Sequence, residues 1–246
     1  MAGNSITIAT VLFAIAGGIL PTLLWLWFWL KEDAKKPEPK RLLVACFTAG
    51  FLTVAIAIVL EDAVQNIFTN TLFPNDYFTP IVFFAIIEET LKYFAVYMIA
   101  FRNADFDEPI DAIVYMITGA LGFAAIENIL YITAAVGQAG AMLGIIAGNL
   151  RFVGATLLHT ATSGIVGIAV GLAFYMNKEK KHLHLAIGLI TASLLHTLFN
   201  LSIIKTDNIG EVLFVFLLLW LLIVPIMLFF EKVKKIHSKT NKEEFI

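Results

Sequence analysis

The sequence predicts an all-α, polytopic transmembrane helical bundle of about seven spans, with an eighth if one further segment inserts. The first observation behind this prediction is composition, since 59% of the 246 residues are hydrophobic and 15% are charged, whereas a soluble domain carries about 25% charged residues. The second is a mean hydropathy of +0.86. The third is the length of the apolar segments, because several reach the roughly 20 residues that a helix needs to cross a hydrocarbon core. We therefore expect residues 1–246 to form a single membrane domain.

Each predicted span is a long apolar run bounded by polar or helix-breaking residues. The run at 6–30 is too long for a signal peptide and lacks its basic flank, so we expect a retained first span. Pro80 and Pro109 suit the first turns of the third and fourth spans, where a missing N–H costs nothing. Pro21 and Pro225 fall inside spans and are expected to kink them. The seven expected spans are 6–30, 42–60, 79–101, 110–133, 149–176, 183–204 and 210–230.

Two connecting segments decide how the spans are joined. Residues 61–78 begin with Glu61 and Asp62 and are expected to form an external loop. Residues 134–148 are small and apolar, and a loop, a re-entrant turn or an extension of the neighbouring spans all fit them. Cys46 is the only cysteine, which excludes an intramolecular disulfide and a cysteine-rich zinc site.

The distribution of basic residues predicts the orientation. Lys and Arg gather in the first loop, in the loop after the fifth span and in the tail 231–246, whereas 61–78 and 134–148 contain none. Because cytoplasmic loops carry an excess of Lys and Arg, the N-terminus is expected outside and the basic tail in the cytoplasm. We expect the lipid bilayer as a partner and no nucleic acid.

Five ionisable residues lie inside the expected spans, where a charge costs a few kcal/mol and is usually functional. At about 1.5 Å of rise per residue, they fall about 9 to 15 Å below the outer ends of their helices. Four helices thus bring their polar residues to one layer in the outer half of the membrane, which indicates one shared cavity. These residues are Glu88, Glu89, Glu127, His159 and His196.

The charge of this layer gives a physical reason to expect a metal. Glu88, Glu89 and Glu127 against Lys92 leave a formal charge of −2, which a divalent cation would cancel. The alternative is that one or two of the glutamates are protonated.

Peptide hydrolysis is one reaction for which these residue types are suited. His159, His196 and Glu127 form a plausible two-histidine, one-carboxylate set for zinc, which activates water and polarises a carbonyl. Glu88 or Glu89 is then a natural general base. Activation of the water by a carboxylate without a metal is the alternative mechanism. Asn200 lies one turn from His196 and could donate a hydrogen bond to an oxyanion or orient a ligand.

At these residues the chain resembles the PrsW family of intramembrane proteases, which is itself similar to the group containing CAAX-processing prenyl endopeptidases. The resemblance covers about residues 80–205, and we take 79–204 as the catalytic core. The matching stretches are Glu88-Glu89-Thr90-Leu91-Lys92, Asp107-Glu108-Pro109-Ile110-Asp111 leading to Tyr115, Gly122 to Asn128 with Tyr131, Arg151 ahead of His159, and His196-Thr197-Leu198-Phe199-Asn200.

The resemblance implies membrane-embedded proteolysis in a bacterial or archaeal cell membrane. It also implies a single-pass membrane protein as substrate, because PrsW-like proteins are associated with site-1 cleavage of a membrane-anchored anti-sigma factor on its extracytoplasmic side. The prenyl endopeptidases have His where Glu127 stands, which argues against a CAAX substrate.

Two other classes of function remain open from the sequence. A transporter or channel could use the Glu and His residues as a proton or cation relay. A relay should continue toward both faces, whereas the inner half of these spans is mostly apolar apart from Lys92. A non-catalytic chaperone or partner-binding protein is the third possibility.

Overall fold

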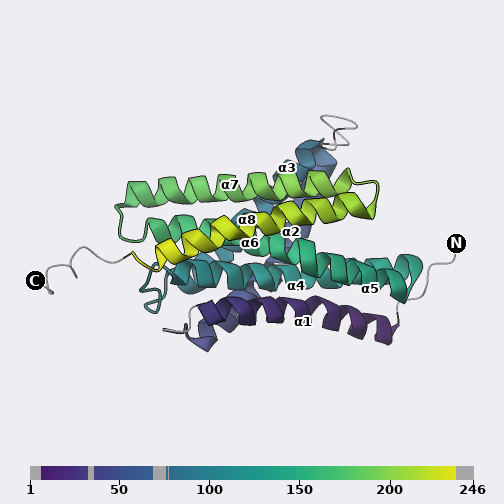
Figure 1. Cartoon of the computed structure of the whole chain (residues 1–246), viewed down its shortest axis with the longest axis horizontal. Helices are drawn as coiled ribbons and strands as arrows, with labels where there is room; N and C mark the ends of the chain where they lie inside the picture. The colour runs from purple at the N-terminus through teal and green to yellow at the C-terminus, as the bar shows by residue number, and fades with distance from the viewer. Residues whose placement is uncertain (1–6, 33–35, 69–75, 77, 237–246) are drawn as a thin grey trace, which may run out of the picture.

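The computed structural model describes residues 7–32, 36–68, 76 and 78–236, and the described residues form helices and turns without a β-strand. Figure 1 shows the helices in chain order from purple to yellow. Two short π-helical turns accompany the α-helices, one at the end of the third helix and one between the fifth and the sixth. The elements are α1 (Ile8–Glu32), α2 (Lys40–Ile67), α3 (Phe78–Val96), η2 (Tyr97–Phe101), α4 (Asp111–Ala139), α5 (Ala141–Leu150), η3 (Arg151–Ala155), α6 (Thr156–Leu172), α7 (Lys178–Ile204) and α8 (Ile209–Val233).

Six helical segments in the described part of the chain are long and apolar enough to cross a membrane. They are α1, α2, α4, α7, α8 and the continuous run 141–172 made by α5, η3 and α6. The expected span over 79–101 is present as α3 and η2, but α3 contains Glu88, Glu89 and Lys92 within its 19 residues. Helices are therefore confirmed at all seven expected places, whereas a count of seven or eight membrane spans is not.

One of the expected boundaries is wrong. The external loop expected from residue 61 starts later, because α2 continues through Glu61 and Asp62 to Ile67. Asp62 accepts a hydrogen bond from Asn66 one turn further on, a local contact that supports the helix. Most of the remaining loop, 69–75 and 77, lies outside the described residues.

The segment 134–148 extends its two neighbours. Helix α4 runs to Ala139 and α5 begins at Ala141, so a single residue separates them. That residue is Gly140, whose φ of 84° is a backbone conformation that other residues rarely adopt.

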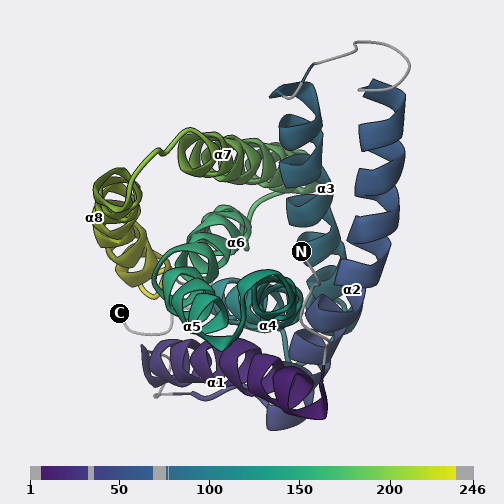
Figure 2. The same ribbon diagram turned by 90° about the vertical axis from the view of Figure 1, so that its right-hand side faces the viewer.

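Helix α4 lies in the middle of the structure and is buried over most of its length. In Figure 2 it is surrounded by α1, α2, α3, α5 and α6, while α2 and α3 stand side by side and run across the other helices. The crossing of α2 and α4 depends on two glycines. A Cβ on Gly50 would lie 1.9 Å from the carbonyl oxygen of Gly119, and a Cβ on Gly122 would lie 1.9 Å from that of Phe47. Small residues of this kind let membrane helices approach closely.

One end of the bundle brings together three interhelical connections and the end of α8. Lys36 before α2 pairs with Asp107 before α4 at 2.8 Å, and the ring of Phe106 meets that of Phe174 after α6 at 5.1 Å. In Figure 1 the α6–α7 connection and the end of α8 lie on the left. We call this end of the bundle the basic end, because many basic residues lie near it. Those that the structure describes are Lys31, Lys36, Lys40, Arg41, Arg102, Lys178, Lys180, Lys181, Lys232, Lys234 and Lys235.

Candidate functional site

Helix α3 provides two adjacent carboxylates and an ammonium group. Asp76 accepts hydrogen bonds from the N–H groups of Phe78 and Thr79, which caps the start of this helix. The helical spacing puts Lys92 three and four residues after the glutamates. Its Nζ lies 3.2 Å from Oε2 of Glu88 and 2.9 Å from Oε1 of Glu89, and all three side chains are buried.

His159 on α6 lies between this group and Glu127 on α4. The Nζ atom of Lys92 lies 2.8 Å from Nδ1 of His159. Because an ammonium group can only donate, Nδ1 accepts, and a neutral ring carries its proton on Nε2. Nε2 lies 2.7 Å from Oε2 of Glu127 and therefore donates to it.

His196 on α7 has the opposite tautomer. Its Nδ1 lies 2.9 Å from Oε1 of Glu89, so Nδ1–H donates to that carboxylate. Thr162 also donates to the same oxygen of Glu89, at 3.1 Å. The lone pair of His196 is consequently on Nε2, which faces the other α3 carboxylate.

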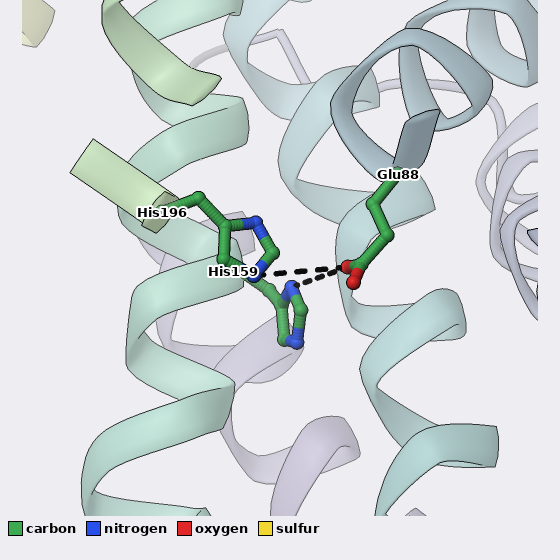
Figure 3. Close-up of side chains that lie close together, drawn as sticks. All are labelled: Glu88, His159 and His196. Atoms are coloured by element: carbon green, nitrogen blue, oxygen red, sulfur yellow. Dashed lines mark ion pairs between the residues drawn. The ribbon is translucent and has the colours of Figure 1, made fainter. Parts of the chain in front are cut away.

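The two histidine lone pairs and Glu88 converge on one point. Oε2 of Glu88 lies 4.0 Å from Nδ1 of His159 and 3.8 Å from Nε2 of His196, as the dashed lines in Figure 3 show. One ligand atom from each residue lies within 4.8 Å of the others, and all three residues are buried. Two imidazole nitrogens and a carboxylate oxygen are a common ligand set of zinc in catalytic sites.

The other side of each imidazole is held by a carboxylate. Glu127 accepts from His159 and Glu89 accepts from His196, an arrangement that fixes the tautomer and orientation of metal-binding histidines in proteins. The distances from Oε2 of Glu88 to the two histidine nitrogens, 4.0 and 3.8 Å, are somewhat larger than the roughly 3.3 Å between neighbouring ligand atoms of a tetrahedral zinc ion. The ammonium of Lys92 contacts three groups of the cluster, so it occupies part of the space in which a cation would be held.

Arg151 in η3 closes the cluster on the α4 side. It donates to Oε2 of Glu127 at 2.9 Å and to the side-chain oxygen of Asn128, and Asn128 donates to Thr156 at 3.0 Å. Three glutamates against Lys92 and Arg151 leave the ionised cluster with a formal charge of −1.

Comparison with known proteins shows the family to which the chain belongs. Residues 38–230 match the family model described as "PrsW family intramembrane metalloprotease". The chain belongs to the PrsW family. Among its relatives, the protein named Protease PrsW of Oceanobacillus iheyensis is 31% identical over 86% of this chain and 93% of its own length. The proteins of the same name from Geobacillus kaustophilus and Bacillus subtilis are 26% and 25% identical, over 84% and 79% of this chain and 87% and 84% of their own lengths. No solved structure matches the chain.

This PrsW relative is therefore an integral membrane peptidase. A transporter or channel is not favoured, because the matched relatives are named as proteases.

The structure brings five of the predicted site residues together: Glu88, Glu89, Glu127, His159 and His196. Within this cluster Glu88, rather than Glu127, faces both histidine lone pairs. Asn200 is half-buried on α7 and makes no side-chain hydrogen bond with the part of the chain that the structure describes.

The stretch from Asp107 to Tyr115 lies at the other end of α4. Asp111 accepts hydrogen bonds from the N–H groups of Asp107 and Glu108 and so closes the turn before the helix. The Tyr115 hydroxyl donates to buried Glu38, which fastens the α1–α2 connection to α4. Sixteen residues, or about 24 Å of helix, separate Asp111 from Glu127. The stretch from Asp107 to Tyr115 therefore lies away from the Glu and His cluster, and its contacts hold the fold together.

Three residues near the cluster were not among the predicted site residues. Glu61 interacts electrostatically with Glu88 and Glu127, and its buried Oε1 lacks a hydrogen-bond partner among the described residues. Arg151 and Thr162 contact the cluster directly. The sequence signal that could have identified Thr162 is its position one turn after His159. The charge of Glu61 instead favours a loop at that position.

Proposed function

We propose that the chain is a metal-dependent endoprotease that cleaves a single-pass membrane protein near the extracytoplasmic side of the membrane. The observation that supports this proposal best is the convergence of Nδ1 of His159, Nε2 of His196 and Oε2 of Glu88 in a buried site. The family description as a metalloprotease points the same way.

Glu88, His159 and His196 are the proposed metal ligands, and zinc is the proposed metal because it favours nitrogen and oxygen ligands of this kind. Glu127 was the carboxylate ligand expected from the sequence. We now propose it as the hydrogen-bond acceptor that orients His159, since Nε2–H donates to it at 2.7 Å. Lys92 must move off Nδ1 of His159 before that nitrogen can bind a metal.

A bound zinc ion would supply an acidified water and a polarised peptide carbonyl. Glu89 is the proposed general base, because its Oε2 is buried and has no hydrogen-bond partner among the described residues. Its other oxygen keeps His196 oriented through Nδ1. Asn200 remains a proposed donor to the developing oxyanion.

The proposed topology has the N-terminus outside and the C-terminus, with the tail 231–246, in the cytoplasm. Support comes from the basic residues at the α1–α2 and α6–α7 connections and at the end of α8, since Lys and Arg mark the cytoplasmic face. The substrate would then be a membrane-anchored protein such as an anti-sigma factor, cut in a site-1 reaction. We further propose 79–204 as the catalytic core and a distant relation to the prenyl endopeptidases.

The test compares protein termini in membranes of cells that express the chain or its variants. New termini in single-pass membrane proteins should appear with the unchanged protein and should be lost with Glu88→Gln and with His159→Ala. The matched controls are Glu179→Gln and His184→Gln, which make related changes outside the cluster on α7. Termini that persist in both cluster variants, or that disappear in both controls, would refute the proposal.

A further inference from the structure

A cavity of about 250 Å³ lies at the basic end of the bundle and is separate from the Glu and His cluster. It is open between the end of α3, the end of α6 and the start of α7. Its walls include five aromatic side chains, Tyr93, Tyr97, Phe101, Phe106 and Phe174. Its remaining lining includes three basic side chains, Lys178, Lys181 and His182.

The basic side chains have no acidic partner among the residues that the structure describes. None of the three forms an ion pair within the described chain, whereas Lys36 and Arg41 at the same end of the bundle are paired with acidic residues of the α3–α4 connection. Lys181 instead lies over the ring of Phe174, at 5.9 Å from its centroid. The cavity therefore offers uncompensated positive charge beside an aromatic wall, which complements a ligand with an anionic group and an apolar body.

The aromatic wall is formed partly by an irregular turn. Tyr97 and Phe101 belong to η2, the π-helical turn that continues α3, and such turns are frequent at functional sites. The rings of Tyr93 and Tyr97 stack at 5.9 Å, and Tyr97 is 39% exposed. An acyl chain could pack along this exposed aromatic face.

We propose that this cavity binds an anionic glycerophospholipid. Its phosphate would lie at Lys178, Lys181 and His182, and an acyl chain would lie against Tyr93 and Tyr97. The location fits, because basic pockets between transmembrane helices are known to bind lipid head groups. A free phosphate ion would use the basic residues but would gain nothing from the aromatic wall.

The lipid would contact three of the four helices that form the histidine and glutamate cluster, namely α3, with its continuation η2, and α6 and α7. Tyr97, in the turn that continues α3, lies nine residues after Glu88; Val170 lies eleven residues after His159; and His182 lies fourteen residues before His196. The separations along the helices are about 14 to 21 Å. A bound lipid would thus hold α3, α6 and α7 together from the end opposite to the cluster.

The test measures lipid binding to the purified full chain by native mass spectrometry and by thermal unfolding in detergent. Dioleoylphosphatidylglycerol should bind and raise the unfolding temperature, whereas dioleoylphosphatidylcholine and inorganic phosphate should have little effect. Lys178→Gln/Lys181→Gln should weaken binding of the anionic lipid about 25-fold, at about fivefold for each lysine. The matched control Lys40→Gln/Lys235→Gln removes two exposed charges near the same end but outside the cavity and should bind as the unchanged protein does.

Several results would overturn the proposal. Equal binding of the two lipids by the unchanged protein would exclude recognition of the anionic head group. Equal losses in the cavity variant and the control variant would indicate attraction by net charge alone. Stabilisation by inorganic phosphate that matches stabilisation by the anionic lipid would indicate a phosphate site instead.

Discussion

Replacing Glu127 by Gln tests whether this residue is a metal ligand or orients one. The change keeps the size of the side chain and removes its charge. Oε2 of Glu127 accepts from His159 at 2.7 Å and from Arg151 at 2.9 Å. An amide oxygen can still accept from the imidazole but does so without the charge that makes this bond strong.

The expected loss of zinc affinity follows from this geometry. Loss of a hydrogen-bond partner of a metal-binding histidine weakens binding about 10- to 100-fold, which corresponds to about 1.4 to 2.8 kcal/mol. Glu88→Gln removes a proposed ligand, so its effect should exceed about 100-fold, the upper end of that range.

The assay is competition for zinc between the purified protein in detergent and a chromophoric chelator of known affinity. Glu179→Gln, a matched change at an exposed position, should leave the affinity unchanged. A larger loss for Glu127→Gln than for Glu88→Gln would refute the proposed assignment and restore Glu127 as the ligand.

Three further predictions concern stability. Gly122→Ala should lower the free energy of unfolding by about 1 to 3 kcal/mol, because the new Cβ meets a backbone carbonyl of α2. Gly137→Ala is the control: no atom lies near its Cβ, so this change should be neutral or stabilising. Thermal unfolding in detergent compares the two variants. Lys92→Met should destabilise the apo protein by about 3 to 5 kcal/mol, because two buried carboxylates lose their cation. Added zinc should restore much of that loss, and no recovery would argue against a cation site. Tyr115→Phe should cost about 1 kcal/mol through loss of its bond to Glu38 and should leave zinc affinity intact, so a loss of zinc binding would contradict its structural role.

Apolar length and intramembrane charge made the helices and the shared cluster predictable from the sequence. Long apolar runs can satisfy their backbone groups in lipid only as helices, and their few ionisable residues must face one another. Counting along the helices therefore brought Glu88, Glu127, His159 and His196 to one layer, and the structure confirms that they meet.

The roles within the cluster could not be obtained in that way. Spacing shows which face of a helix carries His159, but it does not show that Nδ1 meets Lys92 while Nε2 meets Glu127. Those contacts depend on helix rotation and on χ angles, which the packing of several helices sets together. Glu61 was missed for a related reason, because an acidic residue at the end of an apolar run is as typical of a loop as of a helix that continues.

The coordination of zinc in the purified protein is the most direct test of the proposed site. Elemental analysis should show one zinc ion per chain. X-ray absorption at the zinc edge should show nitrogen and oxygen ligands near 2.0 to 2.1 Å and the multiple scattering of two imidazole rings. A chain that takes up no stoichiometric zinc, or that binds it without imidazole ligands, would contradict the account.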